Sequence, residues 1–203
     1  MTTDYARARR HLSRRDPVIR DLMRTHGKCG LADAQHGDPF GALMKAIVSQ
    51  QLSTKAAHTI FTRLMALFDG VPTPRALAAL TDAQLRGVGL SGQKLRYMRD
   101  LGGKVQDGSL PLRTLDAMAD EEVIVALTQV KGIGRWTAEM FLMFRLHRPD
   151  VLPVDDLGIV KAVQKAYKLR KTPSADRLNQ IGDAWRPYRS VACWYLWRSL
   201  NND

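Results

Sequence analysis

Two neighbouring carboxylates, Asp155 and Asp156, follow a Leu-Pro-Val segment and stand where a helix is predicted to begin. Aspartate is a favoured N-cap residue, so one of the two has a purely structural interpretation. A carboxylate at a helix start can also act chemically on a molecule that is bound beside it. The pair therefore leaves two roles open, helix capping alone and a chemical role.

The segment Lys-Gly-Ile-Gly-Arg-Trp lies upstream of this pair and indicates a tight hairpin between two helices. Gly132 and Gly134 can adopt positive φ and allow another backbone to come close. The helix that follows begins near Arg135, so its first amides have no partner within the helix and can bind phosphate. Ile133 is expected to anchor the hairpin in the core, while Lys131 and Arg135 supply positive charge. The hairpin is therefore predicted to hold a nucleic-acid backbone.

The charge balance favours a polyanionic partner. The 203 residues include 31 Lys and Arg against 20 Asp and Glu, a formal net charge of +11, and such an excess steers association with nucleic acid. Only two cysteines are present, Cys29 and Cys193, with no Cys/His cluster around them, which excludes a structural zinc site and a four-cysteine iron–sulfur cluster. No apolar run has the length of a membrane span. We therefore expect a cytoplasmic protein, nucleoid-associated if bacterial, with no membrane partner.

Helical periodicity dominates the chain, and no segment predicts a strand. Helix starts are indicated at Asp38, Ser53 and Ser91, because Asp and Ser are favoured N-caps and Pro39 suits a first helical position. We therefore predict an all-α fold. We expect one helical unit, residues 1–203, made of two lobes: lobe one at about 38–110, and lobe two at about 111–200 together with the N-terminal helix region.

Several segments together resemble the helix-hairpin-helix DNA glycosylases, and within that superfamily the 3-methyladenine DNA glycosylase II family. The string Gly-Ile-Gly-Arg-Trp-Thr-Ala at residues 132–138 is the most specific of them. The resemblance covers roughly residues 38–200 and implies an all-helical, two-lobed fold that grips DNA at the lobe junction. It matches a compact form of the family, without the N-terminal β domain of some members. The other segments that carry it are 40–57 with its Ser-Gln-Gln turn, 87–91, 153–156 and 185–190.

The resemblance implies a base-excision-repair enzyme that hydrolyses the N-glycosidic bond of alkylated purines of the 3-methyladenine and 7-methylguanine type. A basic residue five positions after the catalytic aspartate is common in the superfamily, and Lys161 has that spacing from Asp156. Asp156 is therefore the expected catalytic residue, and Asp155 is left a capping or orienting role. Trp136 occupies the position at which strand-cutting relatives carry a nucleophilic lysine. The enzyme is thus expected to be monofunctional and to leave an abasic site.

The resemblance also implies how the DNA and the base are held. Trp136 is expected to stack on the flipped, electron-poor base, and Gln51 or Leu52 to fill the gap that the base leaves. Where the best-characterised relatives have further aromatic residues, this chain has Met140 and Leu157, which implies a less aromatic pocket. Core packing is expected for Trp185, Trp194 and Trp197. The expected base pocket comprises Trp136, Tyr188, Met140, Leu157 and Phe40, and the expected DNA contacts are Lys131, Gly132, Gly134, Arg135, Gln51, Leu52 and Ser53.

No cofactor is expected to be required, but the resemblance implies a structural sodium or potassium ion on the carbonyls of Thr128, Val130 and Ile133. The expected partner is double-stranded DNA that contains alkylated bases, bound by a monomer. Two alternatives stay open. One is a helix-hairpin-helix module that binds DNA without chemistry, and the other is the same fold acting on a deaminated or mismatched base.

Overall fold

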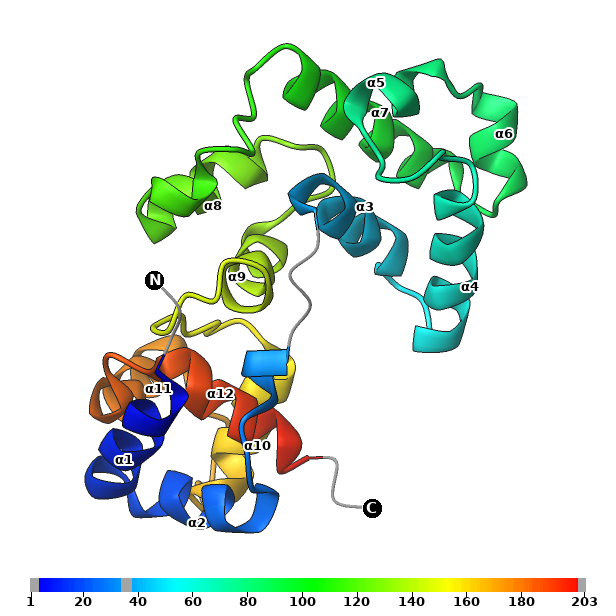
Figure 1. The fold of residues 1–203 in the computed structure, drawn as a ribbon. Helices are drawn as coiled ribbons and strands as arrows, with labels where there is room; N and C mark the ends of the chain where they lie inside the picture. The colour runs from blue at the N-terminus through cyan, green and yellow to red at the C-terminus, as the bar shows by residue number, and fades with distance from the viewer. Residues whose placement is uncertain (1–3, 34–37, 201–203) are drawn as a thin grey trace. The chain divides into compact units, whose positions relative to one another are not determined.

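A computed structural model describes residues 4–33 and 38–200. This part of the chain is built from helices alone, with twelve α-helices, three short 3₁₀ helices and no strand (Figure 1), which confirms the all-α prediction. The α-helices are α1 (Tyr5–Arg15), α2 (Pro17–His26), α3 (Pro39–Ser49), α4 (Thr54–Met65), α5 (Pro74–Ala79), α6 (Asp82–Gly87), α7 (Gly92–Gln106), α8 (Asp120–Thr128), α9 (Arg135–Phe144), α10 (Leu157–Ala166), α11 (Ala175–Gly182) and α12 (Arg189–Arg198). The 3₁₀ helices are η1 (Gly30–Asp33), η2 (Leu115–Ala117) and η3 (Asp183–Trp185).

The chain divides into two compact units. Unit 1 comprises Met1–Gln35 and Leu142–Asp203, and unit 2 comprises His36–Phe141. The division after residue 141 falls inside α9 and differs from the boundary expected near residue 110. The physical reason is that the segment after α7 stays bound to it: the Lys131 backbone N–H donates to Asp100 Oδ2 at 2.8 Å. The segment 111–141 therefore belongs with the first predicted lobe.

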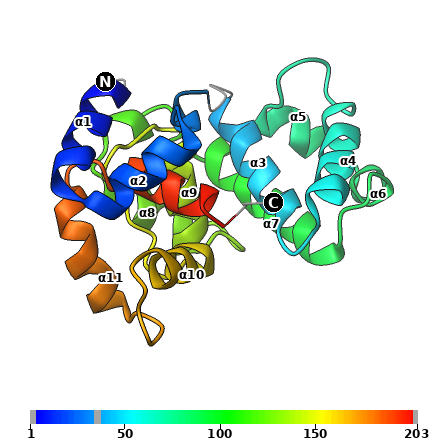
Figure 2. The same cartoon turned by 90° about the horizontal axis from the view of Figure 1, so that it is seen from below.

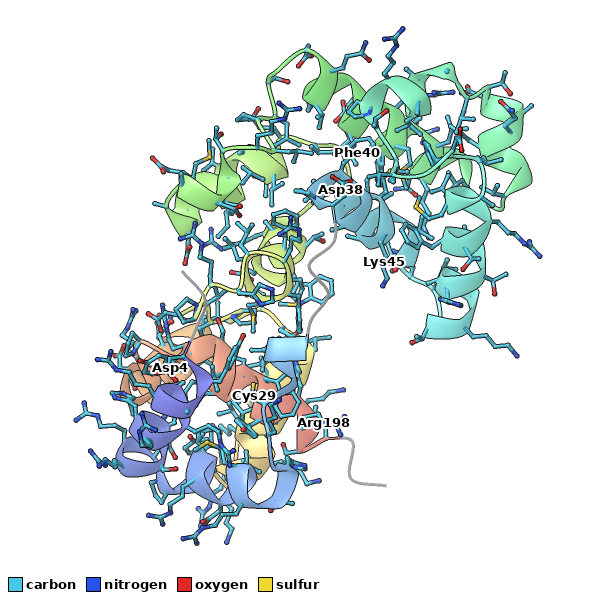
Figure 3. The ribbon with its side chains drawn as sticks, viewed as in Figure 1. Asp4, Cys29, Asp38, Phe40, Lys45 and Arg198 are labelled. Atoms are coloured by element: carbon cyan, nitrogen blue, oxygen red, sulfur yellow. The ribbon has the colours of Figure 1, made fainter. Side chains whose placement is uncertain are left out.

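The helix starts follow the caps that the sequence indicates. The Asp38 carboxylate accepts from the Gly41 N–H at 2.7 Å, with Pro39 in the first turn of α3. Ser53 and Ser91 cap α4 and α7 in the same way. Each cap supplies an acceptor for an amide that has no partner within its helix. Figure 3 labels Asp38 and Phe40 at this end of α3, with Lys45 further along the helix.

Unit 1 is organised around α12, the red helix in Figure 2, and this helix packs against α10 and against α2. A buried carboxylate, Asp16, joins the two N-terminal helices to the later part of the unit. Its Oδ1 accepts from the N–H groups of Val18 and Ile19, and its Oδ2 accepts from the Tyr167 hydroxyl and from Trp185 Nε1. Trp185 is fully buried, as predicted. Burial, aided by the bond to Asp16, raises the pKa of Tyr167 well above its usual range.

Asp16→Asn should lower the free energy of unfolding, because an amide NH₂ replaces an oxygen that accepts from Tyr167 and Trp185. The expected loss is about 1–3 kcal/mol, which corresponds to a melting temperature lower by roughly 3–10 °C. Thermal unfolding followed by circular dichroism measures it. Asp21→Asn on α2 is the matched control, since that side chain is 65% exposed. Equal melting temperatures for the two variants would show that the buried network contributes nothing.

Unit 2 is organised around α7, against which α3, α5 and α6 pack. Gly102 of α7 allows the close approach to α5, because a Cβ atom there would lie 3.1 Å from Leu77 Cδ2. None of the helices in the described residues is both long enough and apolar enough to cross a membrane. The hairpin between α8 and α9 and the loop between α3 and α4 both contact α7, so this helix positions both of them.

Candidate functional site

Asp156 is the N-cap of α10 and is also oriented by a second donor. The turn before it closes through a bond from the Asp156 N–H to the Pro153 carbonyl at 3.1 Å. Its Oδ1 accepts from the Ile159 N–H at 2.7 Å and from Trp197 Nε1–H at 2.9 Å. The residue is only 9% exposed. These two donors fix the orientation of the carboxylate at the start of α10.

The sequence did not indicate that Trp197 and Gly158 determine the environment of Asp156. Core packing was expected for Trp197, and this was wrong: the indole is half-buried, donates to Asp156 and stacks on Phe144 with ring centroids 5.9 Å apart. A Cβ atom at Gly158 would lie 2.9 Å from Asp156 Oδ1 and 3.1 Å from the Trp197 ring. Glycine at this position leaves room for the bond between the indole and the carboxylate.

The neighbouring carboxylate, Asp155, does not share these contacts. It is exposed, and within the described residues its side chain makes no hydrogen bond or ion pair. The capping role expected for Asp155 is therefore wrong, because the N-cap of α10 is Asp156, whose side chain accepts from the Ile159 N–H. Lys161, which favoured Asp156 by its spacing, is exposed on α10.

The hairpin between α8 and α9 has the backbone that its glycines suggested. Gly132 has φ of +82°, and a Cβ atom there would lie 2.2 Å from the Tyr97 ring, so glycine is required on two grounds. A Cβ at Gly134 would meet nothing within 4 Å, which leaves room beside the start of α9. Ile133 is 3% exposed and anchors the turn, as predicted. In the described part of the chain, the Gly132 and Gly134 amides donate to no other group.

The two basic residues of the hairpin differ in their pairing. The Arg135 guanidinium binds both oxygens of Glu121, at 2.8 and 2.9 Å, and lies 3.3 Å from Glu139 Oε1. These bonds raise the pKa of Arg135, and the bond from Arg135 lowers the pKa of Glu121. Lys131 is exposed and forms no ion pair with any described residue. Arg135 therefore braces α8 against α9, and Lys131 carries the uncompensated charge of the hairpin.

The loop between α3 and α4, here called the wedge loop (Gln50–Ser53), contacts the hairpin. Gln50 Nε2–H donates to the Gly132 carbonyl at 2.6 Å. Gln51 is exposed with φ of +55°, and Leu52 is 39% exposed. Ser53 caps α4 by accepting from the Ala56 N–H at 3.3 Å. The structure thus brings the two groups of expected DNA contacts together, and Gln51 and Leu52 keep their side chains in solvent.

The residues expected to line a base pocket differ in exposure. Trp136 is 49% exposed on α9, with the half-buried Met140 one turn later. Leu157, directly after Asp156, is 72% exposed. Tyr188 is half-buried and meets His11 edge to face, with ring centroids 5.4 Å apart. Phe40 is 2% exposed, so it offers little surface to a base.

The model of a family described as HhH-GPD superfamily base excision DNA repair protein matches residues 44–187. A DNA-3-methyladenine glycosylase 1 from Schizosaccharomyces pombe is 32% identical over 203 residues, which is 98% of this chain and 89% of that protein.

No group of three or more His, Cys, Asp and Glu side chains suited to a metal ion occurs among the described residues.

Two solved structures are similar over nearly the whole chain. One is a Schizosaccharomyces pombe 3-methyladenine DNA glycosylase in complex with abasic DNA, with a TM-score of 0.80 and 32% identity over 95% of this chain and 96% of that one. The other is a Bacillus halodurans DNA-3-methyladenine glycosidase, with a TM-score of 0.85 and 35% identity over 100% of this chain and 92% of that one.

Proposed function

Because the chain belongs to the HhH-GPD superfamily of base excision DNA repair proteins, we propose that it is a monofunctional DNA N-glycosylase for alkylated purines. The observation that carries this proposal is Asp156, a carboxylate whose Oδ1 is fixed by Ile159 and Trp197. The three similar proteins and structures named above are all called 3-methyladenine DNA glycosylases or glycosidases, which supports the alkylated substrate. The substrate is double-stranded DNA, in keeping with the net charge of +11.

The Asp156 carboxylate acts on the sugar. As the bond from C1′ to the base breaks, the deoxyribose acquires oxocarbenium character, and a fixed negative charge stabilises it. A 3-methyladenine or 7-methylguanine base carries a positive charge in DNA and takes the bonding electrons, so it leaves neutral without a proton from the enzyme. Water then adds to C1′ and loses a proton, which leaves an abasic sugar and an intact strand.

Trp136 is proposed as the surface on which the flipped base stacks, since its indole is 49% exposed at the start of α9. Tryptophan cannot form the Schiff base that leads to strand cleavage, and Lys131 lies on the other side of the hairpin glycines. Leu157 and Met140 offer apolar rather than aromatic surface, which favours a narrower range of lesions. The hairpin amides and Lys131 hold the DNA backbone.

The test is incubation with duplex DNA methylated at random, with the free bases identified by mass spectrometry. We expect 3-methyladenine, 7-methylguanine or both to be released, with strand breaks only after alkali. Release of a deaminated or mismatched base alone would keep the fold but change the substrate. Binding to damaged DNA without release of any base would make the protein a non-enzymatic module and overturn the proposal.

Trp197→Phe should slow base release without weakening DNA binding. The variant keeps an aromatic ring against Phe144 but removes the N–H that donates to Asp156 Oδ1. Loss of one hydrogen bond to a charged group predicts a rate lower by about ten-fold. Single-turnover kinetics measure the rate, and the affinity for the same duplex provides the control. An unchanged rate would show that the indole does not position the carboxylate.

We also propose that a sodium or potassium ion binds the carbonyls of Thr128, Val130 and Ile133. The Thr128 carbonyl suits such an ion, because Thr128 is the last residue of α8 and the last carbonyls of a helix have no partner within it. The Val130 carbonyl accepts from the Ile133 N–H at 3.0 Å and keeps a second lone pair. Such an ion would steady the hairpin and add positive charge near phosphate. DNA affinity measured in potassium and in choline chloride at equal ionic strength tests this, and equal affinities would refute it.

A further inference from the structure

The wedge loop begins where α3 ends, and a lysine from another helix caps that end. Lys94 of α7 donates from Nζ to the Val48 carbonyl at 2.7 Å and to the Gln50 carbonyl at 2.8 Å. The last carbonyls of a helix have no partner within the helix, so the ammonium supplies donors that they lack. Lys94 is half-buried, and burial lowers its pKa.

The residue after this helix end has an uncommon backbone. A glycine usually occupies the left-handed position after a C-cap, but here Gln51 has φ of +55°. A non-glycine residue in that region costs of order 1 kcal/mol and persists where its surroundings fix it. Lys94 fixes the carbonyls on either side of Ser49, and Gln50 binds the Gly132 carbonyl at 2.6 Å. These contacts hold the exposed Gln51 and Leu52 in one arrangement.

The helix that carries Lys94 also positions the hairpin. Tyr97 lies one turn further along α7, and its ring occupies the space that a Cβ atom at Gly132 would need. Asp100, on the following turn, accepts from the Lys131 backbone N–H at 2.8 Å. One stretch of α7 therefore contacts both structures that are expected to hold DNA.

We propose that Lys94 is a positioning residue that fixes the wedge loop relative to the hairpin, so that Gln51 or Leu52 is already placed to fill the gap left by the departing base. This inference rests on the proposed glycosylase function. Removing a base from the stack costs a few kcal/mol, and a loop that is ordered beforehand loses less conformational entropy when it enters the DNA. Lys94 acts through the loop, because its ammonium donates to the Val48 and Gln50 carbonyls.

The experiment compares two substrates that differ in the cost of base flipping. Each carries one 7-methylguanine, paired with cytosine in the first duplex and unpaired as a single-nucleotide bulge in the second. Lys94→Met removes the donors at similar length, and Lys94→Arg keeps the charge and restores donors. Arg99→Met is the matched control, because Arg99 also lies on α7 and donates to helix-end carbonyls, those of Leu77 and Leu80 near the end of α5.

For Lys94→Met we expect the single-turnover rate to fall about ten-fold on the paired lesion and less than about three-fold on the bulge, since the bulge has already met much of the cost of opening. Lys94→Arg should recover most of the lost rate. Arg99→Met should keep the wild-type ratio of the rate on the paired lesion to the rate on the bulge. Equal losses of Lys94→Met on both substrates, or no loss on either, would overturn the inference.

Two further measurements keep the outcomes distinct. Gln50→Met removes the bond from the loop to the Gly132 carbonyl of the hairpin. It should lower the ratio of the rate on the paired lesion to the rate on the bulge, even if Lys94→Met fails to fold. If Gln50→Met also left this ratio unchanged, these contacts would not position the loop, and the inference would be wrong. A wild-type enzyme that releases neither 7-methylguanine from these duplexes nor 3-methyladenine from methylated DNA would contradict the proposed function itself. Wild-type release together with unchanged ratios for Gln50→Met and Lys94→Met would contradict only the positioning of the loop by these contacts.

Discussion

Asp156→Asn should abolish base release while DNA binding persists. Asparagine retains an oxygen that can accept from the Ile159 N–H and from Trp197 Nε1–H, so the cap of α10 and the position of the side chain are preserved. The negative charge is lost, and an NH₂ group replaces the other oxygen. Removing one fixed electrostatic group from an active site costs about 10²–10³ in rate, and we expect at least that loss in single-turnover kinetics.

Asp155→Asn is the matched control for this result. It makes the same change of charge one residue away, on an exposed side chain without hydrogen bonds among the described residues. We expect its rate to stay within about two-fold of wild type, as is usual for surface substitutions of small energetic effect. A large loss in Asp155→Asn together with a near-normal Asp156→Asn would reverse the assignment of the two carboxylates.

Gly132→Ala is the second change with a large expected effect, in this case on DNA affinity. The added Cβ would lie 2.2 Å from the Tyr97 ring, and the alanine would have to keep φ of +82°. The hairpin must shift, which displaces the neighbouring amides and the carbonyl bound by Gln50. Strain of this kind is of order 1–3 kcal/mol, so we expect affinity for duplex DNA to fall roughly 10- to 100-fold, as measured by fluorescence anisotropy.

Gly70→Ala separates backbone strain from the collision. Gly70 also has positive φ, at +93°, but a Cβ there would meet nothing within 4 Å, and the residue lies outside the hairpin. This control should lower thermal stability and leave DNA affinity unchanged. A Gly132→Ala protein that binds DNA as tightly as wild type would argue that the hairpin geometry does not govern binding.

The sequence was sufficient for features that depend on neighbouring residues. The caps at Asp38, Ser53 and Ser91, the glycine turn at Gly132 and a helix start at the Asp155–Asp156 pair all follow from local backbone chemistry, and the structure has each of them. Local hydrogen bonds within three or four residues decide such elements, so their signals lie close together in the chain.

Features that depend on distant contacts could not be predicted in the same way. Trp197 follows Asp156 by 41 residues, and core packing was expected for it as for most tryptophans of a helical protein. The pairing of Arg135 with Glu121 depends on how α8 packs against α9, and the unit boundary depends on which helices the hairpin contacts. Only the glycine at position 158 carried a signal, since a glycine in the first turn of a helix is unfavourable without a reason in packing.

The most direct test of the central claim is one reaction, a duplex with a single 7-methylguanine treated in parallel with wild type and Asp156→Asn. The free base is identified by mass spectrometry, and strand integrity is examined before alkali treatment. A parallel reaction contains borohydride, which traps any Schiff base between protein and DNA as a covalent adduct. We predict that wild type alone releases the base, that the strand stays whole, and that no covalent adduct is trapped. Release by both proteins, or a trapped adduct with a cut strand, would contradict hydrolysis by the Asp156 carboxylate.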